Sequence, residues 1–544
     1  MKRDHPSAWN PAIMLMNILV SVIGAIVGLE LIARLGISTN TSIIGALFAI
    51  IIARIPLKIL KRFKDINTQN LVQTAMSGST FAASNGIFLS IGIPFLLGRQ
   101  DLVIPMLIGA ALAVAIDATV LYLVFDTEMF PAKAAWAPGI AAAEAMLAVA
   151  EKGRKSVILM VGMAGGVVGK IFGIPTDILG VAWIGNIYAL AAFGVGLLIA
   201  EYAPRWSIDL SGAYIPHGMM IGAGFVALIQ MVVILMRKSR SEKERTLAAK
   251  CNGQISGDMP VSEGGNGGEY TRTLAGMKIS LVKGFAAYLL VALAMAFMCG
   301  FMSDMSAGMF VWWIIFAAIS AIVSELIVGI SAMHSGWFPA FATAFIFLIL
   351  GMLFGFPPAA LAILVGFTSA TGPAFADMAY DLKSGWIVRG RGADKEFEME
   401  GRRQQYIVKM ISAVVAVLVV IFTYKAYFAQ GMFAPVDKVF VATIDAGTNA
   451  EVAKNLALWA IPGALIQAVG GSKKQLGVLF ATGLLIATPM AGITVLIGIL
   501  IRAVVLKKYG DQGQSNLYIL GAGFITGAAL YGFFSSTMSL GKRR

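Results

Sequence analysis

Acidic side chains stand inside segments of this sequence that are otherwise apolar. Glu144 is flanked by alanines, and Glu325 lies in a run of aliphatic residues. An ionised carboxyl at the centre of a bilayer costs at least about 2 to 3 kcal/mol unless it is paired or hydrated. Burial therefore favours the neutral acid, which can bind and release a proton. We predict Glu144, first, and Glu325 as proton-binding candidates, with an ion pair or a hydrogen bond to a helix end as the alternative role. Glu30, Asp117 and His334 raise the same question.

A second acidic pair follows an apolar segment. Asp377 and Asp381 are four residues apart, so on a helix they share a face and can hold one proton between them or attract a cation. Lys383 is the expected neutralising partner. A solvated ion pair at the membrane edge is the alternative interpretation.

Polar residues also recur at helical spacing after position 69. Asn70, Gln73, Ser77 and Ser84 are separated by three, four and seven residues, which places them along one side of a helix. Small and hydroxyl residues let helices pack closely in lipid, and that is one interpretation. The other is that Asn70, Gln73, Thr74 and Ser77 line a pathway or bind a ligand.

Two short motifs predict breaks in membrane helices. Pro138 and Gly139 interrupt one segment, and Thr371 with the following Gly-Pro interrupts another. Irregular backbone at membrane depth must be enclosed by protein or line a cavity. We therefore predict that Pro138, Gly139 and Thr371 face a common central cavity. His217 is a further ligand candidate, because it can bind a carboxylate or titrate near neutrality; capping or packing is its alternative role.

Other site chemistries find little support. The run Gly165-Gly-Val-Val-Gly169-Lys170 has neither the spacing nor the hydroxyl residue of a phosphate loop. Three histidines and two cysteines, without a thiolate pair, give no recognisable metal site. A membrane-embedded enzyme would need a nucleophile with a base, or a His/Glu metal set. We expect no enzyme, no cofactor and no metal.

The elements that carry these residues are membrane helices. Of 544 residues 58% are hydrophobic and 13% are charged, with a mean hydropathy of +0.81. Apolar runs long enough to cross a bilayer recur along the chain, so we predict an all-α polytopic fold of roughly sixteen segments, some broken or re-entrant. The net charge of +13 does not indicate nucleic acid, because the basic residues gather in the connections. They include Arg54, Lys58, Arg237, Lys238, Arg389, Arg391, Arg402, Arg403, Arg543 and Arg544.

A charged and then glycine-rich stretch divides the chain. Residues 237–273 have no apolar period and predict a flexible linker between two pseudo-repeated transmembrane halves, 1–236 and 274–544. Basic residues at both ends and in this linker place all three in the cytoplasm. Lys152 and its basic neighbours disagree with that orientation unless 131–150 is broken or re-entrant.

Several motifs, in order along the chain, resemble those of the oligopeptide transporter (OPT) family. Asn70-Leu-Val-Gln73-Thr74 is similar to its N-x-x-Q-T segment, and Pro138-Gly139-Ile-Ala-Ala-Ala-Glu144 is similar to its P-x-G-x-A-x-A-E signature. Asp381-Leu-Lys-Ser-Gly385, with Arg402-Arg-Gln-Gln405 downstream, resembles its D-L-K-x-G and R-x-Q elements. Gly521-Ala-Gly-Phe-Ile-Thr-Gly527 resembles its closing glycine-rich helix. The family's usual Glu between Pro138 and Gly139 is absent.

The resemblance implies a secondary transporter of the bacterial inner membrane, related to the bacterial OPT/YSL-like members. Its expected activity is proton-coupled import of short peptides or peptide-like compounds. Import of metal complexes with amino-acid-derived chelators is the alternative substrate class, and a membrane channel is the rival protein class. The expected partners are the substrate, protons and lipid, with no nucleic acid; a homodimer is one candidate oligomeric state.

Overall fold

A computed structural model describes residues 4–36, 62–134, 136–151, 154–184, 186–227, 229–230, 233, 270–335, 340–447, 450–485 and 490–541. These residues form helices and irregular connections, and none of the described segments is a strand. Residues 37–61 and most of the predicted linker at 237–273 lie outside the described residues.

The helices of the first half are α1 (Pro11–Leu35), α3 (Ile66–Phe81), η2 (Ala82–Phe88), α4 (Leu89–Leu96), η3 (Gln100–Leu102), α5 (Val103–Val124), α6 (Ala137–Glu151), α7 (Arg154–Ile171), α8 (Thr176–Ile184), α9 (Ile187–Tyr202) and η4 (Ala203–Trp206). Those of the second half are α11 (Leu274–Met298), α12 (Phe301–Asp304), α13 (Ala307–Ser335), α14 (Ala340–Leu353), α15 (Pro358–Ala370), α16 (Pro373–Val388), α17 (Lys395–Ala429), α18 (Pro435–Ala446), α19 (Ala450–Lys474), α20 (Leu476–Leu485) and α21 (Ala491–Gly541).

The lengths and composition of these helices confirm the polytopic membrane fold. In the described part of the chain, nine helical segments are long and apolar enough to cross a membrane, and four shorter apolar helices have 10–17 residues. Large apolar side chains point outward from them: Phe422 is 81% exposed and Val469 is 85% exposed. Such a surface suits lipid rather than water.

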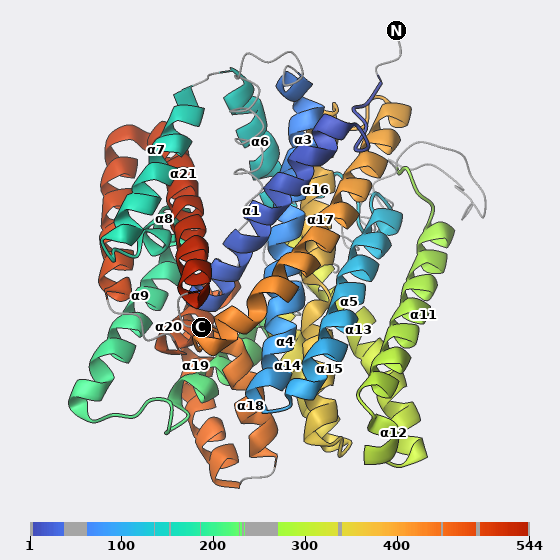
Figure 1. Cartoon of the computed structure of the whole chain (residues 1–544), viewed down its shortest axis with the longest axis vertical. Helices are drawn as coiled ribbons and strands as arrows, with labels where there is room; N and C mark the ends of the chain where they lie inside the picture. Colours follow the sequence, from blue (N-terminus) through green and yellow to red (C-terminus); the bar gives the residue numbers. More distant parts are fainter. Residues whose placement is uncertain are drawn as a thin grey trace, which may run out of the picture.

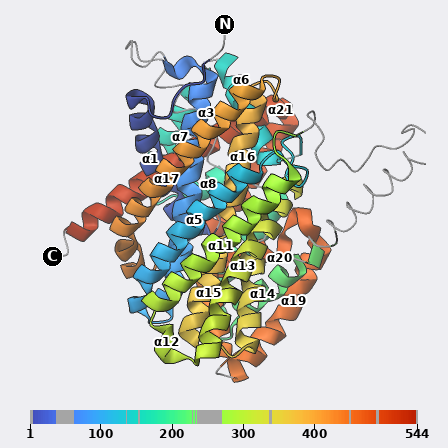
Figure 2. The same cartoon turned by 90° about the vertical axis from the view of Figure 1, so that its right-hand side faces the viewer.

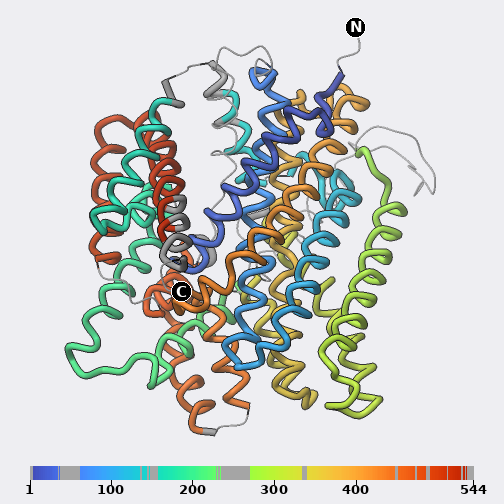
Figure 3. Tube along the Cα trace, viewed as in Figure 1, coloured from blue at the N-terminus to red at the C-terminus, as the bar shows by residue number. Residues whose placement is uncertain are grey.

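The helices pack in two groups that each draw on both halves of the chain. In Figure 1, α7, α8, α9 and α21 gather on the left, and α3, α5, α11, α13, α16 and α17 lie to their right. The helix α1 runs obliquely between the two groups and contacts α3, α17 and α21 (Figure 3).

A glycine seam joins α7 to α21. Gly162 and Gly166 of α7 lie against the backbone of α21, and Gly523 and Gly527 of α21 lie against the backbone of α7. A Cβ on Gly166 would stand 2.4 Å from the carbonyl oxygen of Phe524, closer than any real contact allows. This is the close helix packing that small residues at four-residue spacing permit in membranes.

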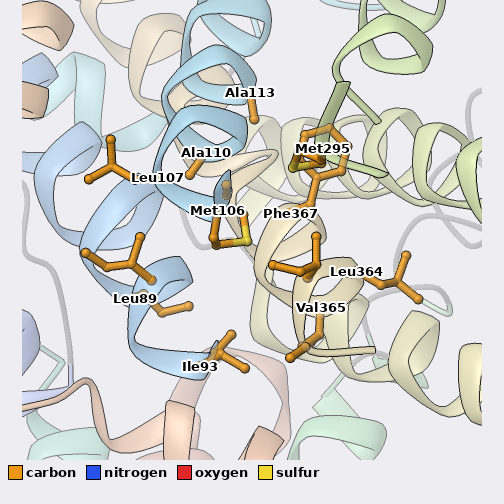
Figure 4. Packing of buried hydrophobic residues seen from close by; sticks show 14 of the residues in the cluster. Leu89, Ile93, Met106, Leu107, Ala110, Ala113, Met295, Leu364, Val365 and Phe367 are labelled. Carbon is orange, nitrogen blue, oxygen red and sulfur yellow. The ribbon is translucent and has the colours of Figure 1, made fainter. Parts of the chain in front are cut away.

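The larger group has an apolar core at the end of the molecule away from α6. Leu89 and Ile93 of α4 and Met106 of α5 pack with Leu364 and Phe367 of α15 (Figure 4). The polar side chains gather elsewhere, along α3, α16 and the first half of α17. The core therefore fixes the positions of α5 and α15, and through them the helix breaks that follow.

The segment predicted at 131–150 is interrupted at its start. After α5 ends at Val124, residues 125–134 are irregular, and α6 begins at Ala137 beside the fully buried side chain of Trp136. With 15 residues, α6 is shorter than the roughly 20 residues that a full crossing needs. This agrees with the expectation that 131–150 is not a plain transmembrane span.

Candidate functional site

The second predicted break, at Thr371, separates two half-helices. The helix α15 ends at Ala370 and α16 begins at Pro373, with Gly372 at a φ of 103°. L side chains rarely adopt that conformation, so glycine suits this position. Pro373 stands at the first helical position, where its missing N–H costs nothing. Thr371 donates through its hydroxyl to the carbonyl oxygen of Thr368, 2.8 Å away, and so closes the end of α15.

Just beyond the break, the paired carboxyls of α16 face an ammonium group. Asp377 and Asp381 are fully buried, and Lys409 of α17 is 3% exposed. Lys409 forms an ion pair with Asp377, and its Nζ lies 2.8 Å from Oδ2 of Asp381. We call Asp377, Asp381 and Lys409 the carboxylate cluster. With two carboxyls and one ammonium group, it can accept one further proton or cationic group.

The polar side of α3 completes the cluster. Ser77 donates a hydrogen bond to Asp377, and Nε2 of Gln73 donates to Oδ1 of Asp381 at 2.5 Å. Asn70 donates to Gln73 and to Ser384, each at 2.9 Å. Asn70, Gln73 and Ser77 of the predicted stripe therefore face α16, whereas Ser84 lies in η2 and donates to the backbone oxygen of Thr80. Each carboxyl of the cluster contacts both α3 and α17.

Thr74 reaches the same region through a glutamine of α17. Nε2 of Gln405 donates to Oγ1 of Thr74 at 3.0 Å and to the backbone oxygen of Asp381 at 2.7 Å. Oε1 of Gln405 accepts from Arg389 at 2.9 Å. The motif residues of α3, α16 and α17 thus share one hydrogen-bonded network.

The expected role of Lys383 was wrong. Its Nζ donates to the backbone oxygens of Ala132 and Ala134, at 2.7 and 2.9 Å, rather than to the aspartates. It also lies over the ring of Trp386. Lys383 therefore holds the irregular chain before α6 against α16, and the cation of the cluster is supplied by Lys409.

Two arginines expected in a solvated connection are also buried. Arg389 binds Glu398 through two hydrogen bonds of 2.8 and 3.1 Å, and Arg402 binds the same carboxyl at 2.7 Å. Arg402 also pairs with Asp126, which follows α5. Arg389 pairs bidentately with Glu398, which suits the fixed geometry of its guanidinium group, whereas Arg402 divides its donors among Glu398, Asp126 and Thr271.

The two residues that open α6 lie beside α16. A Cβ on Gly139 would stand 2.6 Å from the backbone oxygen of Tyr380 and 2.8 Å from Cβ of Lys383. Pro138 precedes it in the first turn and is partly buried. Glu144 lies in α6, but its side chain falls outside the described residues. Gly139 therefore packs directly against α16. That Pro138 and Gly139 share a cavity with Thr371 stays a prediction, since none of the three lines either cavity described below.

The remaining candidates have other surroundings. His217 lies in the short apolar helix Ile215–Ala227, packed beside Tyr214. Glu30 pairs with Arg34 and accepts a hydrogen bond from Tyr427, which is the structural role given as its alternative. Glu325 is buried near Asp117, and no residue of the cluster is among the groups that act on it. His334 has a side chain outside the described residues.

Two cavities of about 740 Å³ each flank this arrangement. One lies between the ends of α1, α9 and α20 and the start of α18, and carries Arg34, Asp209 and Lys438 on its walls. The other reaches Arg389 between the N-terminal segment, the start of α3 and the start of α17. Neither cavity is lined by the carboxylate cluster, which is therefore closed from both in this conformation. Among the described residues, no group of three His, Cys, Asp or Glu side chains could hold a metal ion.

Sequence reasoning did not identify Lys409 as a site residue. The available signal was a lysine inside the apolar segment 406–428, where a charge is expensive and so indicates a buried partner. Glu398 and Arg389 were missed for a different reason, since a run rich in charges is normally solvated. Their pairing depends on how α17 folds back over the end of α16.

Comparison with known proteins identifies the family. The family model described as OPT oligopeptide transporter protein matches residues 211–539, more than half of the chain and all of α16 and α17. No curated protein matches the chain. The members of this family are membrane transporters rather than enzymes. The buried network, the broken helices and this match lead to one conclusion: the chain belongs to the OPT oligopeptide transporter family.

Proposed function

We propose that this protein imports short peptides or peptide-like compounds across the bacterial inner membrane, driven by protons that bind the carboxylate cluster. The observation that carries the proposal is the fully buried arrangement of Asp377, Asp381 and Lys409 beside a broken helix. Ionisable groups at such depth are expensive and are typically found on substrate or proton pathways. The family membership supports the substrate class.

The charges of the cluster suggest how a proton could change the conformation. With both carboxyls ionised, Lys409 attracts Asp377 and Asp381 together and ties α17 to α16. A proton on Asp381 removes one of these attractions and leaves the ammonium group to Asp377 alone. Because Gln73 of α3 also binds Asp381, the same proton loosens a contact between the two halves of the chain. Alternating access needs such a contact to form and break.

Glu144 remains a second candidate for the proton. It follows the irregular segment that packs on α16, and its immediate sequence neighbours offer no cation. The substrate pathway is proposed to pass between α3, α6 and α16, along Asn70, Gln73, Thr74, Ser77 and the breaks at Pro138–Gly139 and Thr371. His217, which is buried within electrostatic reach of Lys438, is proposed as a contact outside this central region.

The test is uptake into proteoliposomes that contain the purified protein. A library of short peptides is compared with metal complexes of amino-acid-derived chelators, with and without an imposed pH gradient. We expect peptide accumulation that requires the gradient, and Asp381→Asn should retain exchange of substrate across the membrane while losing accumulation. Accumulation that ignores the gradient would overturn proton coupling, and uptake of the chelates alone would replace the substrate class.

A further inference from the structure

Three buried side chains meet at the N-terminus of α16, apart from the carboxylate cluster. Asp117 comes from α5, Tyr288 from α11 and Glu325 from α13, and all three are fully buried. The three helices lie side by side in Figure 2, with α11 between α5 and α13. The function proposed above makes no use of this group.

Asp117 has the surroundings of an ionised carboxylate. Its Oδ1 accepts from the hydroxyl of Tyr288 at 2.5 Å, and its Oδ2 accepts from the backbone N–H of Gly372 at 2.6 Å and of Phe375 at 3.4 Å. Burial opposes a charge on Asp117, and these three donors together with the positive end of α16 act against that penalty. Asp117 therefore caps α16 directly after the break.

Glu325 has the opposite surroundings. Neither of its carboxyl oxygens makes a hydrogen bond of full geometry among the described residues, and its nearest polar neighbour is the hydroxyl of Tyr288, which already donates to Asp117. The titratable groups that act on it are Asp117 and the hydroxyl of Tyr288, and neither supplies a positive charge. The helices α14 and α15 contain no titratable residue, and α6 contributes Glu144, whose side chain is not described. A second negative charge beside Asp117 would be buried without compensation, so Glu325 is expected to be a neutral acid.

We propose that Glu325 is a second proton-binding site, and that its proton controls how firmly Asp117 holds the N-terminus of α16. The protonated Glu325 can donate to the hydroxyl of Tyr288, which already donates to Asp117. Loss of the proton leaves two carboxylates competing for one hydroxyl. Their repulsion acts on Asp117, and through it on the N–H groups of Gly372 and Phe375.

The position of α16 gives this site its consequence. The helix is held at its first turn by Asp117 and further along by Lys409 acting on Asp377 and Asp381. A proton leaving Glu325 would loosen the first of these two attachments without touching the second. The role of this loosening in transport rests on the proposed function. The binding of a proton by Glu325 does not depend on it.

Infrared spectroscopy of the protein in lipid tests the proton directly. A buried neutral carboxylic acid gives its own carbonyl stretching band, so wild-type protein near neutral pH should show a band that Glu325→Gln removes. The matched control is Glu451→Gln, at an exposed acid of α19, which should leave the band in place. Asp117→Asn should make the band disappear at lower pH, because the repelling charge is gone. A wild-type spectrum without the band, or one in which Glu325→Gln retains it, overturns the proposal.

Hydrogen exchange of the Gly372, Ala374 and Phe375 amides tests the link to α16. In the wild type, exchange of these amides should speed up at the pH where the band disappears, and in Glu325→Gln it should stay slow. Exchange that follows pH equally in both proteins would refute the control of α16. If the band and the exchange behave as expected but uptake ignores the pH gradient, the site stands and the proposed proton coupling fails.

Discussion

Replacing Lys409 by methionine is the sharpest test of the carboxylate cluster. The substitution keeps an unbranched side chain one atom shorter than lysine and removes its charge, which leaves Asp377 and Asp381 buried with no cation between them. Removing one partner of a buried ion pair costs about 3 to 5 kcal/mol, because the other charge is stranded. Here two carboxyls lose the same partner, so we expect the free energy of unfolding to fall by an amount in the upper part of that range at neutral pH.

The control for this substitution lies on the same helix. Lys425 of α17 is exposed and contacts only the ring of Tyr424 among the interactions described for it. Lys425→Met should therefore change the stability by about 0.5 kcal/mol or less. Thermal unfolding of both variants in the same detergent, followed by intrinsic fluorescence, compares them with the wild type.

A compensating variant distinguishes charge from packing. Combining Lys409→Met with Asp377→Asn and Asp381→Asn removes all three charges with little change in volume. Replacing a buried ion pair by neutral groups is often neutral or stabilising, so this triple variant should melt above Lys409→Met. The electrostatic reasoning is refuted if Lys409→Met has the same melting temperature as Lys425→Met, or if the triple variant melts no higher than Lys409→Met.

Four further expectations follow from particular residues. Gly372→Ala should lower the amount of folded protein in membranes, because a φ of 103° costs an L residue about 1 to 3 kcal/mol. Gly308→Ala is the control, since a Cβ there meets open space, and it should leave the amount unchanged. Equal amounts of the two variants would contradict this prediction. Glu144→Gln should still exchange substrate but lose accumulation driven by a pH gradient, and normal accumulation would remove Glu144 from the coupling. Burial lowers the pKa of His5 from 6.5 to about 4, so the N-terminal segment should be most firmly packed above pH 6.5 and loosen as the pH falls towards 4. Hydrogen exchange of the amides in this segment measures the packing, and an exchange rate with no such change in protection would contradict the prediction. A single cysteine placed within 237–273 should react in intact spheroplasts only with a membrane-permeant reagent, and reaction with an impermeant one would reverse the proposed topology.

The sequence was sufficient for features that depend on local chemistry. Pro373 after a glycine predicts the break at Thr371 whatever surrounds it, and the spacing of Asn70, Gln73 and Ser77 places them on one helix face. Apolar length predicts the membrane helices in the same way. Each of these inferences needs only a few adjacent residues.

The pairing of charges needed the tertiary structure. Lys383 is two residues from Asp381, but on a helix that spacing turns it to another side, where it meets the carbonyls before α6. Lys409 is 28 residues away and reaches Asp381 because α17 packs along α16. Asp117 was recognised as an acid in lipid, yet the N–H groups that it caps are 255 residues further along the chain. Proximity in sequence is a poor guide to partners that lie on different helices.

The glycine seam between α7 and α21 has a consequence for how the protein can move. At this contact the close approaches of Gly162, Gly166, Gly523 and Gly527 are to backbone atoms of the opposite helix. Backbone carbonyls and Cα atoms do not titrate and have no alternative rotamers, so neither a proton nor a ligand gives this contact a second state. The attachments of α16 through Asp117, Asp377 and Asp381, by contrast, involve carboxyl side chains, the groups for which proton binding is proposed above. The contact between α7 and α21 is therefore suited to stay fixed during the transport cycle, while α16 moves relative to it.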